Sequence, residues 1–405
     1  MTNNTINIVG GIYQEICMRP DWREIYGSAG RAASAISQLG GKVILHGYAD
    51  SMASAALESR SALENFDLAI LPTTKGITFH YAHGLATPII SYLKLPLDPI
   101  AVTADRVIRF GMIETEAIVV ADFVVYDPQN VKDPVHFSDN GSRANHLALV
   151  LNQFEAATLS GLPRGTIEEM VEVLVDKSRA EVIIVKLGPQ GALVWEKGIF
   201  HRIPAYWTES VWKIGSGDTF VANFSAHWMS GESALNAALK ASQATAYYCQ
   251  NRSFATRSQV DCFSPEPILI TDAYRQGKKP SVYLAGPFFT LAQLWLVEEA
   301  RNQLTAMGLQ VFSPYHDVGH ASAEDVASKD LAAIKKSDIV FAISDGLDSG
   351  TMFEIGFAKA NGKPVIIYFE NEPDKDLKMA EGAQCIIVKD YVSAIYRTLW
   401  EAIKQ

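Results

Sequence analysis

The sequence is poor in cysteine and has no excess of positive charge. The four cysteines among its 405 residues are scattered and form no Cys-x-x-Cys pair. This spacing argues against a disulfide framework and against a zinc site, so we expect no bound metal. Acidic residues outnumber basic ones by 45 to 35, which gives a net charge of -10. A nucleic-acid backbone is therefore not an expected partner.

Long apolar runs, repeats and low-complexity tracts are also absent. The longest apolar stretch, around Ala117 to Tyr126, contains Asp122 and is too short to span a bilayer. Apolar residues make up 48% of the chain and charged residues 20%, which is typical of soluble globular proteins. We expect a cytoplasmic protein that does not bind membranes.

The length of the chain predicts two or three domains, because a single core rarely grows to this size. The segments Ser264-Pro265-Glu266-Pro267 and Gln276-Gly277-Lys278-Lys279-Pro280 have the composition of a linker. We therefore predict one domain over residues 1–255, a linker over residues 256–280 and a second domain over residues 281–405.

Strand and helix patterns alternate along the first domain. Strands are predicted at 6–9, 42–46, 149–151 and 182–185, and helices at 53–63, 143–148 and 168–177. This alternation predicts a largely parallel sheet that is covered by helices on both faces.

A glycine-rich segment, Gly215-Ser216-Gly217-Asp218, precedes a helical pattern in this domain. Two glycines around a small residue allow successive backbone amides to bind an anion at the helix N-terminus. Asp218 would then take a proton from a hydroxyl group that is being phosphorylated. The segment is equally well explained as a helix start that Asp218 caps, and the motif alone does not decide between the two.

Four segments together resemble the ribokinase (PfkB-type) family of sugar and nucleoside kinases over roughly residues 6–250. They are Gly27-Ser28-Ala29-Gly30, Asn152-Gln153-Phe154-Glu155, Lys186-Leu187-Gly188-Pro189-Gln190-Gly191 and Gly215-Ser216-Gly217-Asp218. The resemblance implies that the last segment forms the anion hole and supplies Asp218 as the base. It also implies that Asn152 and Glu155 lie near phosphate and metal, with ATP and Mg²⁺ as cofactors if the kinase site is active.

Four positions depart from the pattern of this family. Trp212-Lys213-Ile214 stands where Asp-Thr-Thr is usual, and Lys186 replaces a threonine. Arg31 stands in place of the usual asparagine, and the aspartate expected after the first strand is absent, with Glu15 the nearest acid. The domain is predicted either to phosphorylate a sugar or nucleoside or to sense one and regulate its neighbour.

The second domain contains a buried-strand pattern at 339–343, an acidic loop with Asp345 and Asp348, and a helix that starts near Gly350. We expect Glu354 in about the first turn of this helix, where the positive end of the helix favours its ionised form. Ligands bind at the carboxyl ends of strands in open α/β sheets. Glu354 is therefore a candidate nucleophile.

The same domain begins with a strand pattern that contains Tyr283 and ends at Gly286, followed by Phe288 and Phe289. Aromatic side chains at this place can wall a flat ring such as a nucleobase. A core strand with two aromatic residues under a loop would give the same pattern. Asp330 lies in a predicted helix further along the chain.

Taken together, these segments resemble the nucleoside 2-deoxyribosyltransferase family in order and spacing over about residues 281–369. The resemblance implies a flavodoxin-type, Rossmann-like domain that cleaves the N-glycosidic bond of a nucleoside or nucleotide. It assigns Glu354 as the nucleophile, Asp348 to the sugar, Asp330 to the base and Tyr283 to the orientation of Glu354. The remaining expected substrate contacts are Gly286, Phe289, Asp345 and Gly350. The expected fold class is thus α/β, with a ribokinase-like sandwich followed by this domain.

The spacing of His316 and His320 looks like a zincin motif, but Pro314 and Gly319 argue against the single helix that such a site needs. We expect a loop there instead of a metal site.

Several alternatives for the function remain open. Hydrolysis and transfer to a second base fit the sequence equally, and neither is expected to need a cofactor. The chain is also compatible with a nucleotide- or NAD-degrading effector of bacterial defence and with a non-catalytic nucleotide sensor. The family resemblance further implies a homo-oligomer that acts on small-molecule nucleosides or nucleotides.

Overall fold

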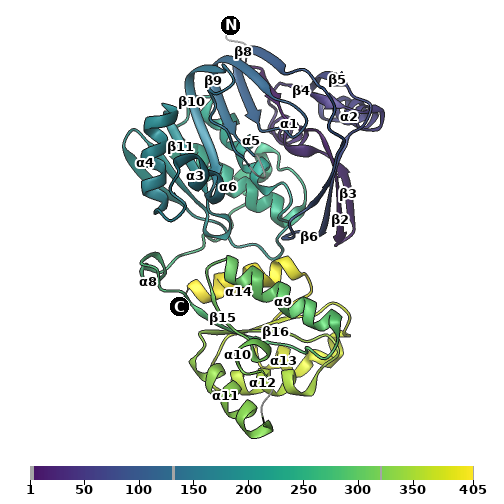
Figure 1. Ribbon diagram of the computed structural model, residues 1–405, viewed down its shortest axis with the longest axis vertical. Coiled ribbons are helices and arrows are strands. Elements are labelled where there is room, and N and C mark those ends of the chain that lie inside the picture. The colour runs from purple at the N-terminus through teal and green to yellow at the C-terminus, as the bar shows by residue number, and fades with distance from the viewer. Residues whose placement is uncertain (1–3, 130–132, 320–321, 405) are drawn as a thin grey trace. The chain divides into compact units, whose positions relative to one another are not determined.

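The computed structural model describes residues 4–129, 133–319 and 322–404, and the chain forms two compact units (Figure 1). The first comprises Met1–Thr208 and Trp212–Pro267, and the second comprises Glu209–Val211 and Ile268–Gln405. Glu209–Val211 belongs to the second unit, where the Val211 backbone N–H donates to Ser393 Oγ at 2.8 Å. Residues 256–280 contain two short helices, α7 (Arg257–Cys262) and α8 (Asp272–Arg275).

The first unit is built on a nine-stranded sheet with the order β13-β12-β11-β10-β9-β8-β1-β4-β5. All neighbouring strands are parallel except the pairs β11–β12 and β12–β13 at one edge. The strands are β1 (Ile6–Val9), β4 (Val43–Ala49), β5 (Asp67–Pro72), β8 (Ile100–Phe110), β9 (Ala117–Asp127), β10 (Arg143–Asn152), β11 (Val182–Lys186), β12 (Ala192–Glu196) and β13 (Ile199–Ile203).

Helices cover both faces of this sheet, as predicted. One face packs against α1 (Gly27–Gln38), α2 (Ser51–Glu64), α5 (Ser216–Trp228) and α6 (Ala234–Asn251). The other packs against α3 (Gln153–Ser160) and α4 (Ile167–Ser178), and a single turn, η1 (Gly188–Gln190), follows β11.

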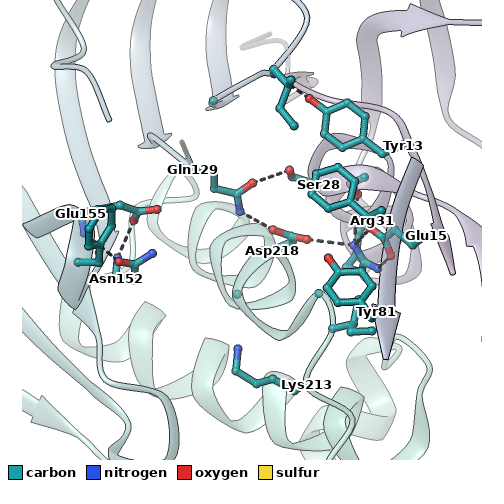
Figure 2. A pocket seen from close by; sticks show the side chains of 18 residues that line it. Tyr13, Glu15, Ser28, Arg31, Tyr81, Gln129, Asn152, Glu155, Lys213 and Asp218 are labelled. Carbon is teal, nitrogen blue, oxygen red and sulfur yellow. Dashed lines mark hydrogen bonds and ion pairs between the residues drawn. The ribbon is translucent and has the colours of Figure 1, made fainter. Parts of the chain in front are cut away.

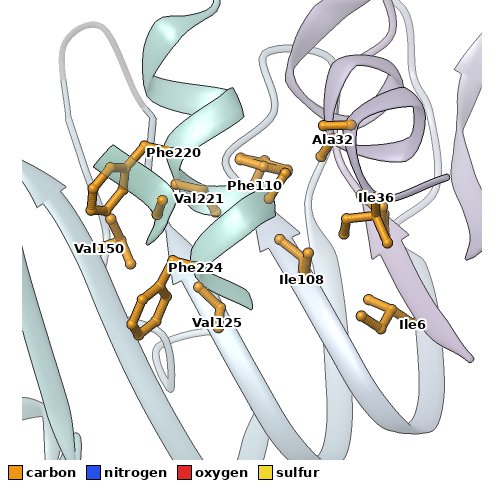
Figure 3. Close-up of a cluster of buried hydrophobic side chains, with 14 of the residues drawn as sticks. Ile6, Ala32, Ile36, Ile108, Phe110, Val125, Val150, Phe220, Val221 and Phe224 are labelled. Atoms are coloured by element: carbon orange, nitrogen blue, oxygen red, sulfur yellow. The ribbon is translucent and has the colours of Figure 1, made fainter. Parts of the chain in front are cut away.

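Strand residues alternate between the two cores, as the pleat of a strand requires. Val182 and Ile184 belong to the core under α5, whereas Ile183 and Val185 belong to the opposite core. In the first core, side chains of α5 pack over the sheet (Figure 3).

Residues 143–148 form the first part of β10, so the helix predicted there is wrong. They pair with β9 in a parallel register that runs from Arg143 opposite Val120 to Ala148 opposite Val125. Because β10 lies between β9 and β11, the hydrogen bonds of the sheet outweigh local helix propensity.

A separate four-stranded sheet has the order β3-β2-β6-β7. Its strands are β2 (Tyr13–Arg19), β3 (Trp22–Ile25), β6 (Ile77–His83) and β7 (Ile89–Ser91), of which only the pair β2–β6 is parallel among the described residues. This sheet brings Tyr13, Glu15, Phe79 and Tyr81 to a pocket of the first unit.

The second unit has a five-stranded, all-parallel sheet with the order β15-β14-β16-β17-β18. This is the 2-1-3-4-5 order of flavodoxin-like folds, in agreement with the expected fold class. The strands are β14 (Ser281–Ala285), β15 (Gln310–Phe312), β16 (Ile339–Ile343), β17 (Val365–Tyr368) and β18 (Ile386–Val388).

Helices also cover both faces of this second sheet (Figure 1). The helices α9 (Leu291–Ala306) and α14 (Tyr391–Ile403) lie on one face, and α11 (Ala323–Lys336), α12 (Ser349–Ala360) and α13 (Lys378–Gly382) lie on the other. Two short turns complete the unit, α10 (Pro314–Asp317) and η2 (Asp374–Leu377). Across the described ranges, no helix combines the length and the apolar character that crossing a bilayer requires.

Candidate functional site

The second unit brings together three of the predicted site residues at the point where its strand order reverses. In the 2-1-3-4-5 order, ligands bind between the first and third strands, here β14 and β16. Tyr283 is on β14, Asp330 is on α11, and Glu354 is on α12, which follows β16. These residues interact with one another electrostatically, although up to 71 positions separate them in the sequence.

The central contact of this site joins Tyr283 to Glu354. The Tyr283 hydroxyl donates a hydrogen bond of 2.5 Å to Glu354 Oε1. Tyr283 is fully buried, and its ring stacks on Phe312 at a centroid distance of 5.6 Å. Burial, Glu354 and Asp330 all raise the pKa of Tyr283, so the phenol remains a neutral donor. It therefore fixes the orientation of the Glu354 carboxylate.

Glu354 lies in the second turn of α12, one turn later than expected, because the helix begins at Ser349 with Asp348 as its N-cap. Its environment also differs from the expectation that the helix N-terminus favours the ionised form. Burial raises the pKa of Glu354 to about 7, the hydrogen bond from Tyr283 lowers it, and Asp330 and Asp348 raise it. Loss of hydration thus outweighs the helix dipole, which falls off beyond the first turn.

Asp330 is a buried acid in the same site as the half-buried Glu354. Only 7% of the residue is exposed, and its Oδ1 has no hydrogen-bond partner within the described ranges. Burial raises the pKa of Asp330 to about 6. A carboxyl group of this kind can carry a proton near neutral pH and give it to a leaving group.

Asp348 and Gly350 lie at the start of α12. Asp348 Oδ2 accepts hydrogen bonds from the Thr351 backbone N–H at 2.8 Å and from Thr351 Oγ1 at 3.0 Å, so this oxygen caps the helix. A Cβ atom at Gly350 would lie 3.1 Å from Asp348 Oδ2, so even alanine would crowd the cap. Asp348 therefore caps the helix, and this role leaves room for a contact with a ligand.

Three further predicted residues surround this edge of the sheet. Asp345 accepts hydrogen bonds of 2.8–3.1 Å from the backbone N–H groups of Glu370 and Asn371, which gives it a structural role in the loop after β17. A Cβ atom at Gly286 would lie 3.2 Å from Ile343 Cβ, so glycine permits close packing of β14 and β16. Phe289 is 72% exposed, and its ring lies 5.3 Å from that of Phe288.

The ring nitrogens of His316 contact two neighbouring side chains, and these do not form a metal-binding cluster. Its Nε2 lies 2.7 Å from Glu298 Oε1, and its Nδ1 lies 3.1 Å from Ser313 Oγ. His320 lies outside the described residues. Among the residues that are described, no group of three or more His, Cys, Asp or Glu side chains could hold a metal ion.

The first unit has a separate pocket of about 330 Å³ at the N-terminal end of α5 (Figure 2). It brings together most of the residues predicted for the kinase-like site. The lining side chains and glycines include Tyr13, Glu15, Ser28, Arg31, Phe79, Tyr81, Gln129, Asn152, Glu155, Lys213, Gly215, Gly217 and Asp218.

Arg31 is buried between two acids of this pocket, with 1% of the residue exposed. Its Nη2 lies 2.5 Å from Glu15 Oε2, and its Nη1 lies 3.0 Å from Asp218 Oδ2. Burial lowers the pKa of Arg31, but the neighbouring Glu15, Tyr248 and Asp218 raise it by more. The other oxygen of Asp218 accepts a hydrogen bond of 2.5 Å from Gln129 Nε2.

The glycine-rich segment starts α5 as predicted, with Gly215 as the N-cap in a left-handed conformation (φ 77°). A Cβ atom at Gly215 would lie 1.8 Å from Arg31 Nε, so only glycine leaves room for the guanidinium. Lys213 Nζ donates a hydrogen bond of 3.1 Å to Ser216 Oγ beside this segment. Burial lowers the pKa of Lys213.

Asn152 and Glu155 cap α3 reciprocally. Asn152 Oδ1 accepts from the Glu155 backbone N–H at 2.9 Å, and Glu155 Oε2 accepts from the Asn152 backbone N–H at 2.7 Å. Burial and the nearby Asp127 raise the pKa of Glu155 to about 7. Lys186 Nζ lies 2.5 Å from Asp127 Oδ2 in the same cluster.

Sequence reasoning missed the aromatic residues Tyr13, Phe79 and Tyr81 of this pocket and two polar residues of its surroundings, Asp127 and Gln129. Asp127 ends β9 directly after the apolar run from Phe123 to Tyr126, and it is completely buried. A charged residue at the carboxyl end of an apolar strand was the signal that could have identified it. Gln129 has no comparable signal, because its contact with Asp218 joins residues 89 positions apart.

Family models match both units of the chain. The model described as "Nucleoside 2-deoxyribosyltransferase" matches residues 282–385, and the model described as "pfkB family carbohydrate kinase" matches residues 126–260. No sequence among the curated proteins gives a significant match.

Solved structures similar to the chain have the fold of ribokinase-type kinases. A protein described as a ribokinase II from E. coli, in complex with ATP and Mg²⁺, is 16% identical and has a TM-score of 0.52. The match covers 64% of this chain and 99% of that chain. A fructokinase double mutant from Vibrio cholerae O395, with fructose, ADP and potassium bound, is 15% identical, with a TM-score of 0.50 and coverage of 65% and 98%.

At these identities the structural matches establish the fold alone, and both matched families are families of enzymes. The two resemblances predicted from the motifs are therefore confirmed: the first unit resembles PfkB-type carbohydrate kinases in sequence and fold, and the second resembles nucleoside 2-deoxyribosyltransferases.

Proposed function

We propose that the second unit cleaves the N-glycosidic bond of a nucleoside or nucleotide with Glu354 as the nucleophile. The observation that carries this proposal is the hydrogen bond from buried Tyr283 to Glu354 Oε1, with buried Asp330 close enough to raise the pKa of Glu354. A carboxylate held by one donor beside a second, protonatable carboxyl group is the arrangement that retaining glycosidases use.

The first step replaces the bond between the anomeric carbon and the base nitrogen. The ionised Glu354 carboxylate attacks the anomeric carbon and forms an ester, while the bonding electron pair leaves with the base. Asp330 gives its proton to the departing base, which leaves as a neutral molecule. Tyr283 keeps the attacking oxygen in place, and Asp348, at the start of α12, contacts the sugar. The step requires no cofactor.

The second step releases the sugar from Glu354. Attack by water on the anomeric carbon gives the free sugar, and attack by a second base gives a new nucleoside. In both cases Asp330, which the first step left ionised, takes the proton that the attacking group loses. In either case the carboxylate of Glu354 is restored. An assay that supplies a nucleoside with and without a different free base measures both outcomes in one experiment.

The nucleophile must be ionised, so its raised pKa sets the pH dependence of the reaction. The productive form has Glu354 ionised and Asp330 protonated. Because the pKa of Glu354, about 7, lies above that of Asp330, about 6, this form is a minor one, and its population declines below the lower value and above the higher value. We expect a bell-shaped profile of kcat/KM with its maximum between these values, measured from base release. Because the two groups interact, the limbs of the profile report the apparent pKa values of the pair and not those of single residues. A profile that rises steadily from acid to alkaline pH would show that Asp330 does not protonate the departing base.

Replacing Tyr283 with phenylalanine keeps the buried ring and removes the hydrogen bond to Glu354. We expect base release to fall by roughly ten- to a hundredfold, the loss of one charge-assisted hydrogen bond. The alkaline limb of the pH profile should also move to higher pH, because this hydrogen bond lowers the pKa of Glu354 and its loss raises that pKa.

The matched control is Tyr368→Phe. Tyr368 lies on β17 of the same sheet and donates a hydrogen bond of 2.6 Å to Glu370. Its loss should leave base release unchanged. Equal effects of the two substitutions would show that Tyr283 acts through stability and not through Glu354.

The substrate is tested with a panel of nucleosides, nucleotides and NAD, in which base or nicotinamide release is followed chromatographically. Preferential nicotinamide release would favour an NAD-degrading effector of bacterial defence. Saturable binding with no product from any member would favour a sensor.

We also place the protein in the cytoplasm, where its scattered cysteines would remain reduced. We propose that it forms a homo-oligomer, as the family resemblance implies.

A further inference from the structure

The pocket region of the first unit contains two cations that are already paired with its acids. The Arg31 guanidinium lies between Glu15 and Asp218, and the Lys186 ammonium contacts Asp127 (Figure 2 shows the first group). Arg31 and Asp127 are 1% and 0% exposed. Removing one partner of such a buried pair is strongly unfavourable, so the two cations are permanent parts of the site.

Asp218 is held in a way that is unsuited to base catalysis. Phosphoryl transfer needs a base with an oxygen that can accept the proton of the attacking hydroxyl group. Here Oδ2 of Asp218 accepts from Arg31, and Oδ1 accepts from Gln129. Gln129 is held in turn by Ser28, whose hydroxyl donates to its Oε1 at 2.5 Å. Both oxygens of the expected base are therefore engaged.

The resemblance to kinases implies a Mg²⁺ ion near Asp127 and Glu155, but these two acids do not fit one. Mg²⁺ needs several oxygen ligands in octahedral geometry at about 2.0–2.1 Å. Lys186 Nζ already lies 2.5 Å from Asp127 Oδ2, and Glu155 Oε2 accepts a backbone hydrogen bond. Asp127 Oδ1 is buried without a partner in the described part of the chain. The ammonium of Lys186 thus neutralises Asp127 and occupies the place beside it that a magnesium ion would need.

The remaining positive charge of the pocket lies beside its glycine-rich segment. Lys213 Nζ contacts Ser216 Oγ, and a Cβ atom at Gly217 would lie 3.6 Å from Lys186 Nζ. Within the described ranges, no carboxylate lies within ion-pair distance of Lys213. Two ammonium groups thus flank the N-terminus of α5, where backbone N–H groups favour an anion.

Aromatic side chains form another wall of the same pocket. The rings of Tyr13 and Phe79 stack at 5.2 Å, and those of Phe79 and Tyr81 at 6.3 Å. Such a wall accepts the flat or apolar face of a ring. The pocket therefore suits a ligand with one anionic end and one ring.

We propose that this pocket binds a small organic phosphate without Mg²⁺ and without transferring its phosphoryl group. Arg31 and Lys186 neutralise the acids that would otherwise serve as base and metal ligands. Lys213 and the segment Gly215–Gly217 receive the phosphate, and the aromatic wall receives the ring of a sugar or a nucleoside. This assignment does not depend on the chemistry of Glu354.

Calorimetric titration of the full chain tests the proposal, with Glu354→Gln as the background so that the second unit does not consume the ligand. ADP and ribose 5-phosphate are titrated separately in Mg²⁺ and in EDTA. We expect at least one to bind with dissociation constants that agree within about threefold between the two buffers. Tighter binding of ADP identifies a nucleotide pocket, and tighter binding of ribose 5-phosphate identifies a sugar-phosphate pocket.

Lys213→Met should weaken this binding by about tenfold or more, because it removes a charge-assisted contact. Lys240→Met, on the surface of α6, is the matched control and should have no effect. Ser216→Ala provides a second variant, with an expected loss of about three- to tenfold, should Lys213→Met fail to fold.

Three results would overturn the proposal. The first is binding that requires Mg²⁺, and the second is the absence of any binding that depends on Lys213 or Ser216. The third is consumption of ATP by the otherwise unmodified chain with a sugar or nucleoside acceptor, abolished in Asp218→Asn. None of these results bears on base release by the second unit, so the two proposals fail separately.

Discussion

Replacing Glu354 with glutamine is expected to reduce base release at least about a thousandfold, because the amide cannot form the glycosyl ester. Glutamine has the shape of glutamate, and its carbonyl oxygen can still accept the hydrogen bond from Tyr283. The fold should therefore be kept, and substrate binding should change far less than turnover. Base release is measured chromatographically under single-turnover and steady-state conditions.

Glu381→Gln is the matched control for this substitution. Glu381 lies on α13 of the same unit and is exposed, so the same chemical change is made outside the proposed site. Full activity in this control with loss of activity in Glu354→Gln supports the assignment. Activity retained by Glu354→Gln would rule out nucleophilic attack by this residue.

Replacing Arg31 with methionine is expected to destabilise the first unit by about 3–5 kcal/mol, because it leaves two buried carboxylates without their cation. Glu15 and Asp218 are 5% and 9% exposed, so water cannot readily replace the guanidinium. For a unit of this size the loss corresponds to a fall in Tm of roughly 10 °C.

Thermal unfolding followed by tryptophan fluorescence measures this effect, since five of the seven tryptophans lie in the first unit (Trp22, Trp195, Trp207, Trp212 and Trp228). Arg202→Met is the control, because Arg202 forms an exposed ion pair with Glu168 at 2.6 Å. Such surface pairs contribute about 0–1 kcal/mol. A Tm for Arg31→Met close to that of the control would mean that Arg31 is not essential to the charge balance of the pocket.

Much of the architecture followed from local patterns in the sequence. The parallel sheet with helices on both faces, and a helix that follows the glycine-rich segment, were predicted from apolar periodicity and glycine spacing. The strand at 143–148 was not, because its extended form depends on pairing with β9 and β11. The small four-stranded sheet was likewise not predicted as a separate sheet, since periodicity does not identify which strands pair.

The two sites were likewise predicted only in part from the sequence. The meeting of Tyr283 and Glu354 was expected only through the order and spacing of family motifs, because the two residues are 71 positions apart. Arg31 was recognised as a departure from the kinase pattern, but its partners were not. A buried arginine resembles an exposed one in sequence, and only the folded chain brings Glu15 and Asp218 to it.

Capture of the glycosyl ester on Glu354 is the most direct test of the proposed reaction. The intact protein is incubated with a nucleoside that carries fluorine beside the anomeric carbon, which slows release of the sugar because it disfavours the oxocarbenium-like transition state. The protein is then digested and its peptides are weighed by mass spectrometry. We predict release of one equivalent of base and a mass increase of one fluorosugar on Glu354. Base release with no sugar on Glu354, or with the sugar on another residue, would contradict the account.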